Sequence, residues 1–142
     1  MDPKVNYATP MFHVREIEAS IAFYELLGFT TIDTDDGRPL DWARLHCEGG
    51  AVMFLRAEHP LEAPLEGVMF TMYTPDLAAF RERMLASGVT ASEIKYPAYM
   101  PSGELYLHDP DGLTVQVIHW GKQEQEKWER HLEERASRKR GQ

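Results

Sequence analysis

Side chains able to bind a ligand or exchange a proton recur at alternate positions in several short segments of the chain. Because successive side chains of a β-strand point to opposite faces, this alternation predicts one polar and aromatic face and one apolar face. A concave face of mixed aromatic and polar groups is typical of a small-molecule binding site. The alternative is that these residues line an interface between two modules or face water. The residues expected on this face are His13, Trp42, Arg44, His46, Phe54, Tyr73, Glu104, Tyr106, His108 and Gln116.

The types of these side chains indicate what a ligand would have to present to the protein. The Arg44 guanidinium can hold a carboxylate or a phosphate through two parallel hydrogen bonds, and the Glu104 carboxylate can receive a cationic group. These two residues could equally pair with each other or with solvent. The loop 96–103 contains two prolines and is expected to form an ordered rim. Aromatic rings supply flat stacking area, here from Trp42, Phe54, Tyr73 and Tyr106.

The elements that carry these residues follow one another in a simple order in the first half of the chain. Alternation predicts a strand at 8–14, and apolar residues at helical spacing predict a helix at 17–27. Gly28 stands where a left-handed helix C-cap belongs. Three further strands are expected within 29–34, 42–47 and 51–56, which gives the order β-α-β-β-β.

The second half of the chain repeats this order. A strand is expected at 68–73, and Thr-Pro-Asp at 74–76 is a strong helix-start signal. The helix spans 77–87, and short strands are expected at 89–94, 104–108 and 113–120.

An internal repeat connects the two halves. An offset of about 60 residues superposes the helices and pairs Met11 with Thr71, whereas the glycines before the last strands suggest an offset of about 62, which pairs Phe54 with Gln116. The expected fold is α+β: two βαβββ modules with pseudo-two-fold symmetry form a curved mixed sheet around a cavity, and a C-terminal helix follows. The expected boundaries are 8–56 for the first module, 57–67 for the linker, 68–120 for the second module and 121–142 for the charged helix and tail.

Composition excludes several classes of protein. The 142 residues carry a formal net charge of −8 and are 43% hydrophobic, as in an ordinary folded domain. Residues 1–120 hold 18 acidic against 8 basic side chains, which disfavours nucleic-acid binding, and no apolar run is long enough to cross a membrane. Cys47 is the single cysteine, so an internal disulfide is excluded and a cytoplasmic location is expected.

Two segments and the module pattern together resemble a known family. The segments are EASIAFYELLGF at 18–29 and DPDG at 109–112, just before the last strand. With the paired βαβββ modules, they resemble the vicinal oxygen chelate superfamily, which includes glyoxalase I, bleomycin-resistance proteins, fosfomycin-resistance transferases and extradiol dioxygenases. The resemblance covers about residues 8–120 and implies the fold more strongly than any one activity.

The resemblance also implies where a divalent metal would bind. Enzymes of this superfamily take metal ligands, usually His, Gln or Glu, from the first and last strands of each module. Hard divalent ions need oxygen or imidazole ligands, which methionine, valine and phenylalanine do not provide. The sequence therefore predicts no cofactor, while a non-standard metal site among His13, His46, Glu104 and His108 stays open. The family positions fall on Thr9, Phe54, Met69 (Val68 if the register slips by one) and Gln116.

The expected function follows from the family's metal-free members, which bind a bulky molecule without altering it. This chain is expected to bind a small aromatic or polar molecule and to form a homodimer. The alternative is an enzyme of this superfamily, a glyoxalase-like lyase or isomerase, a transferase or a dioxygenase-like protein, that uses a non-standard metal or acid–base groups such as His13, His46, Glu104 and Tyr106. A third interpretation is an interaction module that docks a partner through its C-terminal helix.

Overall fold

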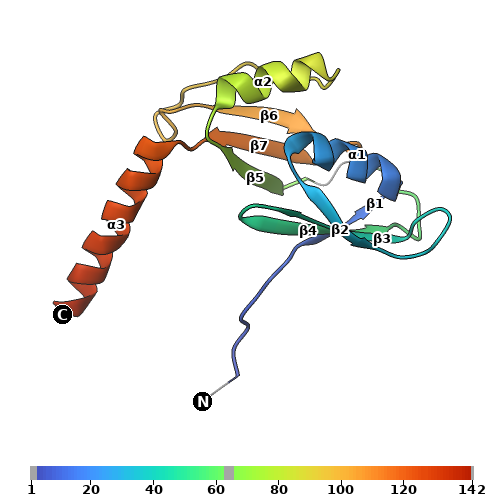
Figure 1. The fold of residues 1–142 in the computed structure, drawn as a ribbon, viewed down its shortest axis with the longest axis horizontal. Helices are drawn as coiled ribbons and strands as arrows, with labels where there is room; N and C mark the ends of the chain where they lie inside the picture. The colour runs from blue at the N-terminus through green and yellow to red at the C-terminus, as the bar shows by residue number, and fades with distance from the viewer. Residues whose placement is uncertain (1–2, 63–65, 142) are drawn as a thin grey trace. The chain divides into compact units, whose positions relative to one another are not determined.

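The structure, a computed structural model, describes residues 3–62 and 66–141 (Figure 1). It divides into two compact units. Unit 1 comprises the described residues of Met1–Val68 together with His108–Leu113, and unit 2 comprises Met69–Leu107 and those of Thr114–Gln142. The α+β class and the C-terminal helix are as predicted.

Unit 1 has the predicted β-α-β-β-β order. Its sheet has the strand order β1-β4-β3-β2, in which β1 runs parallel to β4 and the other pairs are antiparallel. The elements are β1 (Met11–Val14), α1 (Ile17–Leu27), β2 (Thr30–Thr34), β3 (Trp42–Cys47) and β4 (Gly50–Arg56).

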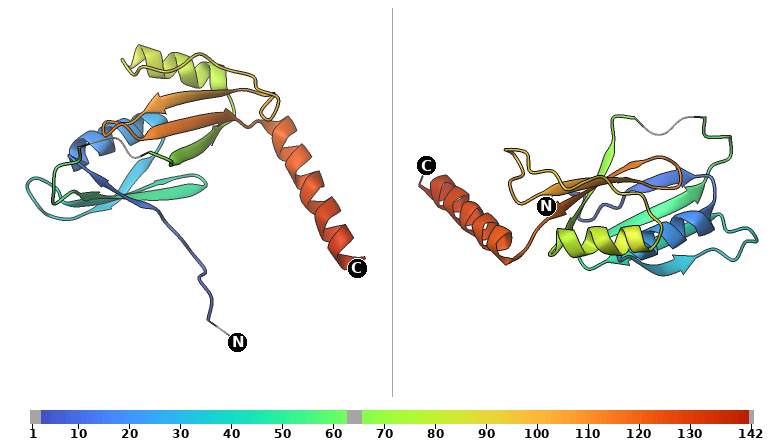
Figure 2. Two further views of the ribbon diagram at one scale, coloured as in Figure 1. Left: turned by 180° about the vertical axis from the view of Figure 1, so that it is seen from behind. Right: turned by 90° about the horizontal axis from the view of Figure 1, so that it is seen from above.

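Helix α1 covers one face of the unit 1 sheet, and the core lies between them (Figures 1 and 2). The helix ends at Gly28, whose φ of 120° places it in the left-handed region that favours glycine. Tyr24 is the largest fully buried side chain, and its ring centroid lies 4.9 Å from that of Phe54. The buried side chains of the sheet that complete this core are Ala43, Leu45, Val52 and Phe54.

Unit 2 contains the repeated module, with one strand fewer than predicted. Its sheet has the order β5-β7-β6, and β5 runs parallel to β7. Asp76 caps α2 by accepting a hydrogen bond from the Ala79 amide, and Leu77, Phe80 and Met84 are the buried residues of this helix. The elements are β5 (Met69–Thr74), α2 (Leu77–Ala86), β6 (Glu104–His108) and β7 (Thr114–His119).

The segment 89–94 is not a strand, contrary to the prediction. Where a ladder would run beside β6, the Tyr106 amide donates to the Ser92 side-chain oxygen, and the Ser92 amide donates to the Tyr106 carbonyl. Regular pairing is limited to an isolated bridge between Lys95 and Glu104. A serine side chain that competes for backbone hydrogen bonds thus replaces part of the ladder.

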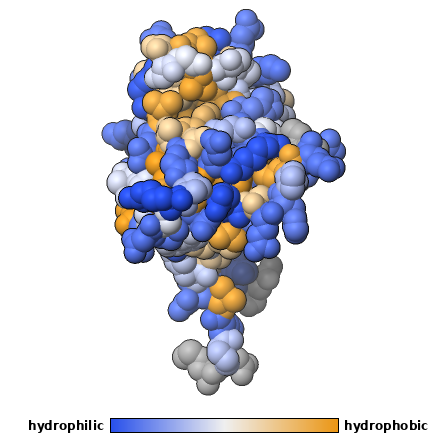
Figure 3. Space-filling view, turned by 90° about the vertical axis from the view of Figure 1, so that its right-hand side faces the viewer, coloured by the Kyte–Doolittle hydropathy of each residue, from blue (hydrophilic) through white to orange (hydrophobic). Residues whose placement is uncertain are grey.

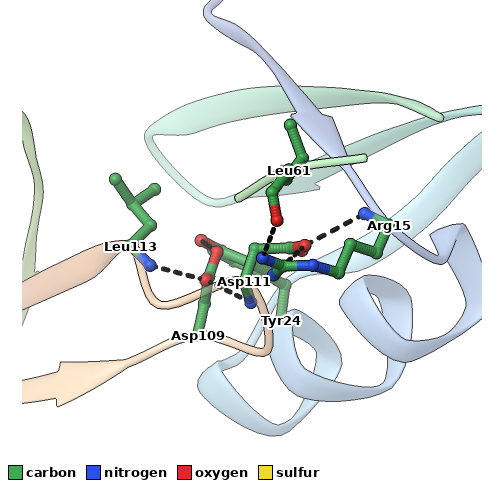
Figure 4. A network of polar contacts seen from close by, with 6 residues as sticks. All are labelled: Arg15, Tyr24, Leu61, Asp109, Asp111 and Leu113. Carbon is green, nitrogen blue, oxygen red and sulfur yellow. Dashed lines mark hydrogen bonds and ion pairs between the residues drawn. The ribbon is translucent and has the colours of Figure 1, made fainter. Parts of the chain in front are cut away.

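The turn between β6 and β7 belongs to unit 1, where two aspartates hold it (Figure 4). Asp109 is buried, and its carboxylate accepts hydrogen bonds from the Tyr24 hydroxyl at 2.9 Å and from the Asp111 and Leu113 amides, each at 2.9 Å. Asp111 accepts from the backbone and the guanidinium of Arg15, at 3.0 and 3.1 Å. The DPDG motif is therefore fixed by its own carboxylates.

Helix α3 (Lys122–Arg140) follows β7 and extends away from the unit 2 sheet (Figures 1 and 2). None of its described residues is buried, and Trp128 and Leu132 are each 45% exposed. On the face drawn in Figure 3, hydrophilic residues surround smaller hydrophobic areas. No helix among the described residues is long and apolar enough to cross a membrane.

Candidate functional site

The uncovered face of the unit 1 sheet carries most of the polar and aromatic residues predicted for that half. Along β3, Trp42, Arg44 and His46 are half-buried, whereas Ala43 and Leu45 between them are fully buried against the helix side. Arg44 lies opposite Met53 of β4, and Met53 lies opposite Met11 of β1. Since cross-strand partners share a face, these side chains form one open surface.

Arg44 lies on this surface and makes no ion pair with a carboxylate among the described residues. Its Nε donates to His46 Nε2 at 2.8 Å. Its Nη2 lies 3.5 Å from the hydroxyl oxygens of Tyr7 and of Thr9, and its Nη1 lies 3.7 Å from the Met53 sulfur. The guanidinium carbon lies 5.8 Å from the centre of the Tyr7 ring. We call these five residues the Arg44 cluster.

A second polar cluster occupies the uncovered face of the unit 2 sheet, around Glu104. This residue is only 2% exposed, and its Oε1 accepts hydrogen bonds from the hydroxyls of Tyr99 at 2.8 Å and Tyr106 at 3.0 Å. Its Oε2 accepts from Gln116 Nε2 at 2.7 Å, and Gln116 Oε1 accepts from the Thr71 hydroxyl at 2.9 Å. We call these residues the Glu104 cluster.

The hydrogen bonds of the Glu104 cluster determine the charge of its carboxyl group. Burial by itself would raise the pKa of Glu104, but the bonds from Tyr99, Tyr106 and Gln116 outweigh burial and hold this pKa below its ordinary value of 4.5. The hydrogen bond that Tyr99 donates to Glu104 is the main cause that raises the pKa of the Tyr99 hydroxyl, to about 12. Glu104 is therefore an anion at neutral pH, and Tyr99 and Tyr106 donate hydrogen bonds to it.

Replacing Glu104 with glutamine is expected to reduce the loss of stability at acid pH. The pKa of Glu104 is lower in the folded state, so its stabilisation is present above pH 4.5 and is lost as the pH falls through the folded pKa. Urea unfolding at several pH values between about 3 and 7 measures this, and the variant should show a shallower slope below pH 4.5 than the parent chain. Glu93→Gln, at an exposed position, is the matched control. Equal slopes for the parent chain and Glu104→Gln would contradict the assignment.

The remaining predicted residues lie outside these two clusters. His13 is exposed on β1, and Trp42 lies on the same open face of unit 1 as Arg44. Tyr73 is exposed on β5, where its ring centre lies 5.5 Å from that of Trp120. His108 is exposed at the end of β6 and is part of unit 1.

The predicted position of Phe54 is wrong. It was expected to face the ligand, but it is fully buried on the helix-covered side of the sheet. The register explains the error: β1 pairs Met11 with Met53, and β5 pairs Thr71 with Gln116. Because the repeat equates Met11 with Thr71, the counterpart of Gln116 is Met53, one residue before Phe54.

Several residues of the two clusters were not predicted as ligand-binding residues. Tyr7 precedes the first strand, and Tyr99 lies in the loop before β6, so neither belongs to a periodic pattern. Thr71 entered the sequence analysis only as the repeat partner of Met11. The cross-strand bond to Gln116 is what gives it a role.

The positions at which the superfamily holds a metal do not fit one in this chain. The Thr9 hydroxyl and the Met53 sulfur are contacted by the Arg44 guanidinium, which is itself a cation. Gln116 is engaged by Glu104 and Thr71, and Met69 is an exposed thioether. Among residues 3–62 and 66–141, no three His, Cys, Asp or Glu side chains are grouped so that they could hold a metal ion.

Solved structures with the same fold include proteins that bind antibiotics. A bleomycin-binding protein in complex with bleomycin is 23% identical, with a TM-score of 0.62 over 82% of this chain and 99% of its own. A bleomycin resistance determinant encoded on the transposon Tn5 is 24% identical, with a TM-score of 0.64 over 83% of this chain and 99% of its own. A fosfomycin resistance protein from Listeria monocytogenes, complexed with Mn(II) and dihydroxypropylphosphonic acid, is 12% identical, with a TM-score of 0.65 over 88% of this chain and 99% of its own.

No individually curated protein sequence matches the chain. The family comparison is positive, however, and covers most of its length. Residues 5–117 match the glyoxalase/bleomycin resistance protein/dioxygenase superfamily, and they include both modules. The chain therefore belongs to this superfamily.

Proposed function

We propose that this protein binds a small aromatic or polar molecule through the open faces of its sheets and does so without chemical change. The observation that carries the proposal is Arg44, a half-buried cation on the open face of the unit 1 sheet that makes no ion pair with a carboxylate among the described residues. Charged groups on mixed aromatic and polar faces are suited to orienting a ligand. The bleomycin-binding protein and an antibiotic-binding protein from Streptomyces sp. CB03234 share the fold and support this class of function.

Binding without a metal is part of the same proposal. The side chains at the superfamily's ligand positions include a thioether and a hydroxyl that Arg44 already contacts. Hard divalent ions do not favour such ligands.

A ligand screen with metal analysis tests the proposal. Purified protein is expected to show a raised thermal midpoint with at least one member of a panel of small aromatic acids, amines and zwitterions, and to contain less than stoichiometric metal. Binding should weaken in Arg44→Gln, whereas Glu93→Gln, the surface control, should leave it unchanged. A panel without any binder would contradict the proposal.

The enzyme alternative gives a different result in the same experiment. Stoichiometric nickel, zinc, manganese or iron that is lost in His46→Ala or Glu104→Gln would favour a lyase, an isomerase or another reaction of the superfamily. The acid–base groups it would use are His13, His46, Glu104 and Tyr106, of which the first two lie in unit 1 and the others in unit 2.

We further propose that helix α3 joins two copies of this chain in a homodimer. Trp128 and Leu132 lie one helical turn apart and are both largely exposed. The groove along the helix is lined by His131, Arg135, Arg138 and Lys139. The segment 1–120 of a second copy, which holds 18 acidic against 8 basic side chains, complements this basic surface.

Solution mass distinguishes this dimer from a monomer that docks another protein. Replacing Trp128 and Leu132 together with alanine should convert the dimer into a monomer in light scattering, whereas Glu126→Ala, on the opposite side of the helix, should leave it unchanged. A monomeric parent chain would contradict the proposal.

The single cysteine, Cys47, is consistent with our proposal of a cytoplasmic location.

A further inference from the structure

Arg44 differs from Arg15 and Arg56 of unit 1 in the partners it has. Arg15 pairs with Asp111 at 3.1 Å, and Arg56 pairs with Asp41 through Nε at 2.7 Å. Arg44 has no ion pair with any carboxylate in the part of the chain that the structure describes. Acidic residues outnumber basic ones by 23 to 15, yet this half-buried arginine has no acidic partner.

The nearest acid by strand register does not neutralise Arg44. Asp33 of β2 is its cross-strand partner, next to an irregularity in the pairing of β2 with β3. Its carboxylate accepts a hydrogen bond from the Thr34 amide at 2.9 Å and makes no ion pair with the guanidinium. The positive charge of Arg44 therefore remains uncompensated within its own sheet.

The geometry of the guanidinium shows which part of it is available. The short bond from Nε to His46 holds the group in place. The two outer nitrogens make only contacts of 3.5 to 3.7 Å, which are at the weak limit of hydrogen bonding, and one of the acceptors is sulfur. The edge formed by Nη1 and Nη2 is the edge with which arginine binds two oxygens of a carboxylate or phosphate.

We propose that Arg44 anchors a site for an oxyanion, a carboxylate or a phosphoryl group, carried by a ligand with an aromatic ring. This inference rests on the proposed small-molecule binding function and names the ligand class. Thr9 and Tyr7 accept contacts from Nη2, so their own hydroxyl protons are not used there and can be donated to the anion. The exposed ring of Tyr7 and the half-buried Trp42 on the same face provide surface for the aromatic part.

His46 is a positioning residue for this site. Its Nε2 accepts the Nε hydrogen bond and so fixes the plane of the guanidinium. Preorganisation of this kind lowers the cost of ordering the side chain when the ligand binds.

Titration with simple probes tests the oxyanion site. Phenylphosphonate and benzoate are compared by calorimetry with benzamide, their uncharged analogue, and with inorganic phosphate, which lacks a ring. The parent chain should bind at least one aromatic anion ten or more times more tightly than benzamide. The stronger of the two shows whether the natural group is phosphoryl or carboxylate, and weaker binding of inorganic phosphate shows the contribution of the ring.

The matched variants locate the binding at Arg44. Arg44→Gln should lower the affinity for the aromatic anions at least tenfold, to the level of benzamide, and Arg44→Lys should give an intermediate affinity because an ammonium cannot form the two-bond fork. Arg56→Gln, at an arginine of the same sheet that already has an acidic partner, should leave the affinity unchanged within about twofold. Circular dichroism and the thermal midpoint establish that each variant is folded.

Each of four outcomes would overturn the inference. Equal affinity in Arg44→Gln and the parent chain would place the anion elsewhere. Coupling between Arg44→Gln and Asp33→Asn in a double-mutant cycle of unfolding would show that Asp33 is the partner of Arg44. If the wider panel contains binders but no anion among them, the oxyanion site is excluded while the proposed function stands. If nothing binds at all, both fail.

Discussion

Replacing Phe54 with alanine is expected to lower the free energy of unfolding by about 3–5 kcal/mol. The side chain is fully buried beneath α1, and its ring lies 4.9 Å from that of Tyr24. Truncation removes apolar surface from the core and leaves a cavity that the surrounding strands fill only partly. Urea denaturation of the variant and the parent chain measures the difference, with equal m-values as the condition for comparison.

Trp42→Ala is the matched control for Phe54→Ala. Trp42 is also a large aromatic residue of this sheet, but it is half-buried on the uncovered face. Its loss should cost no more than about 1–2 kcal/mol, since much of its surface stays in water. Under the proposed function it should also weaken ligand binding. A Phe54→Ala variant that keeps its stability but loses ligand binding would reverse the two assignments.

The position of Phe54 shows what alternation can and cannot predict. On β3, polar and apolar residues alternate, so the faces of Arg44 and Leu45 were predicted correctly. On β4, Val52, Phe54 and the residues next to them are nearly all apolar, and the pattern does not distinguish the faces. The correspondence between β4 and β7 therefore had to be inferred from the glycines that precede these two strands.

That alignment failed because the two hairpins have turns of different length. Cys47 pairs directly with Gly50, which leaves two residues in the turn. In the second hairpin, the Asp109 amide bonds to the Leu113 carbonyl, which leaves three. The additional residue shifts the true correspondence of the last strands by one, and in a strand a shift of one reverses the face.

The fold class and the module order were accessible from sequence because they depend on local periodicity and on caps. Gly28 ends α1 where it was expected, and α2 begins directly after the predicted 74–76 start signal, with Asp76 as its N-cap. The Arg44 and Glu104 clusters depend instead on Tyr7 and Tyr99, which lie outside periodic segments. No local pattern predicts such contacts, because they exist only once the chain has folded.

Replacing Asp109 with alanine is the second large effect, an expected loss of about 2–4 kcal/mol in the free energy of unfolding. The substitution removes the acceptor for the Tyr24 hydroxyl and for the Asp111 and Leu113 amides. Tyr24 is fully buried, so the 2.9 Å bond from its hydroxyl to Asp109 would be lost where water has little access to replace it. The DPDG turn would lose the bonds that hold it in unit 1 (Figure 4).

Two variants separate the buried bond from the exposed one beside it. Asp111→Ala breaks the ion pair with Arg15, a largely exposed side chain, and should cost no more than about 1 kcal/mol. Tyr24→Phe combined with Asp109→Ala should cost less than the two single changes added together, because both changes remove the same hydrogen bond. Strict additivity would show that the 2.9 Å bond contributes nothing to stability.

The pH dependence at Asp109 should oppose that of Glu104. Burial is the main cause that raises the pKa of Asp109 above its ordinary value of 3.8, against the hydrogen bonds that lower it. Its contribution is therefore greatest below pH 3.8 and is lost as the pH rises through the folded pKa, whereas that of Glu104 is lost as the pH falls. Burial and the negative charge of Asp109 raise the pKa of Tyr24 as well, so the phenol stays a donor throughout. In Asp109→Asn the loss of stability with rising pH should disappear, and in Glu104→Gln the loss with falling pH should shrink. Opposite changes of slope at two carboxylates of one chain would show that burial governs the first and hydrogen bonding the second.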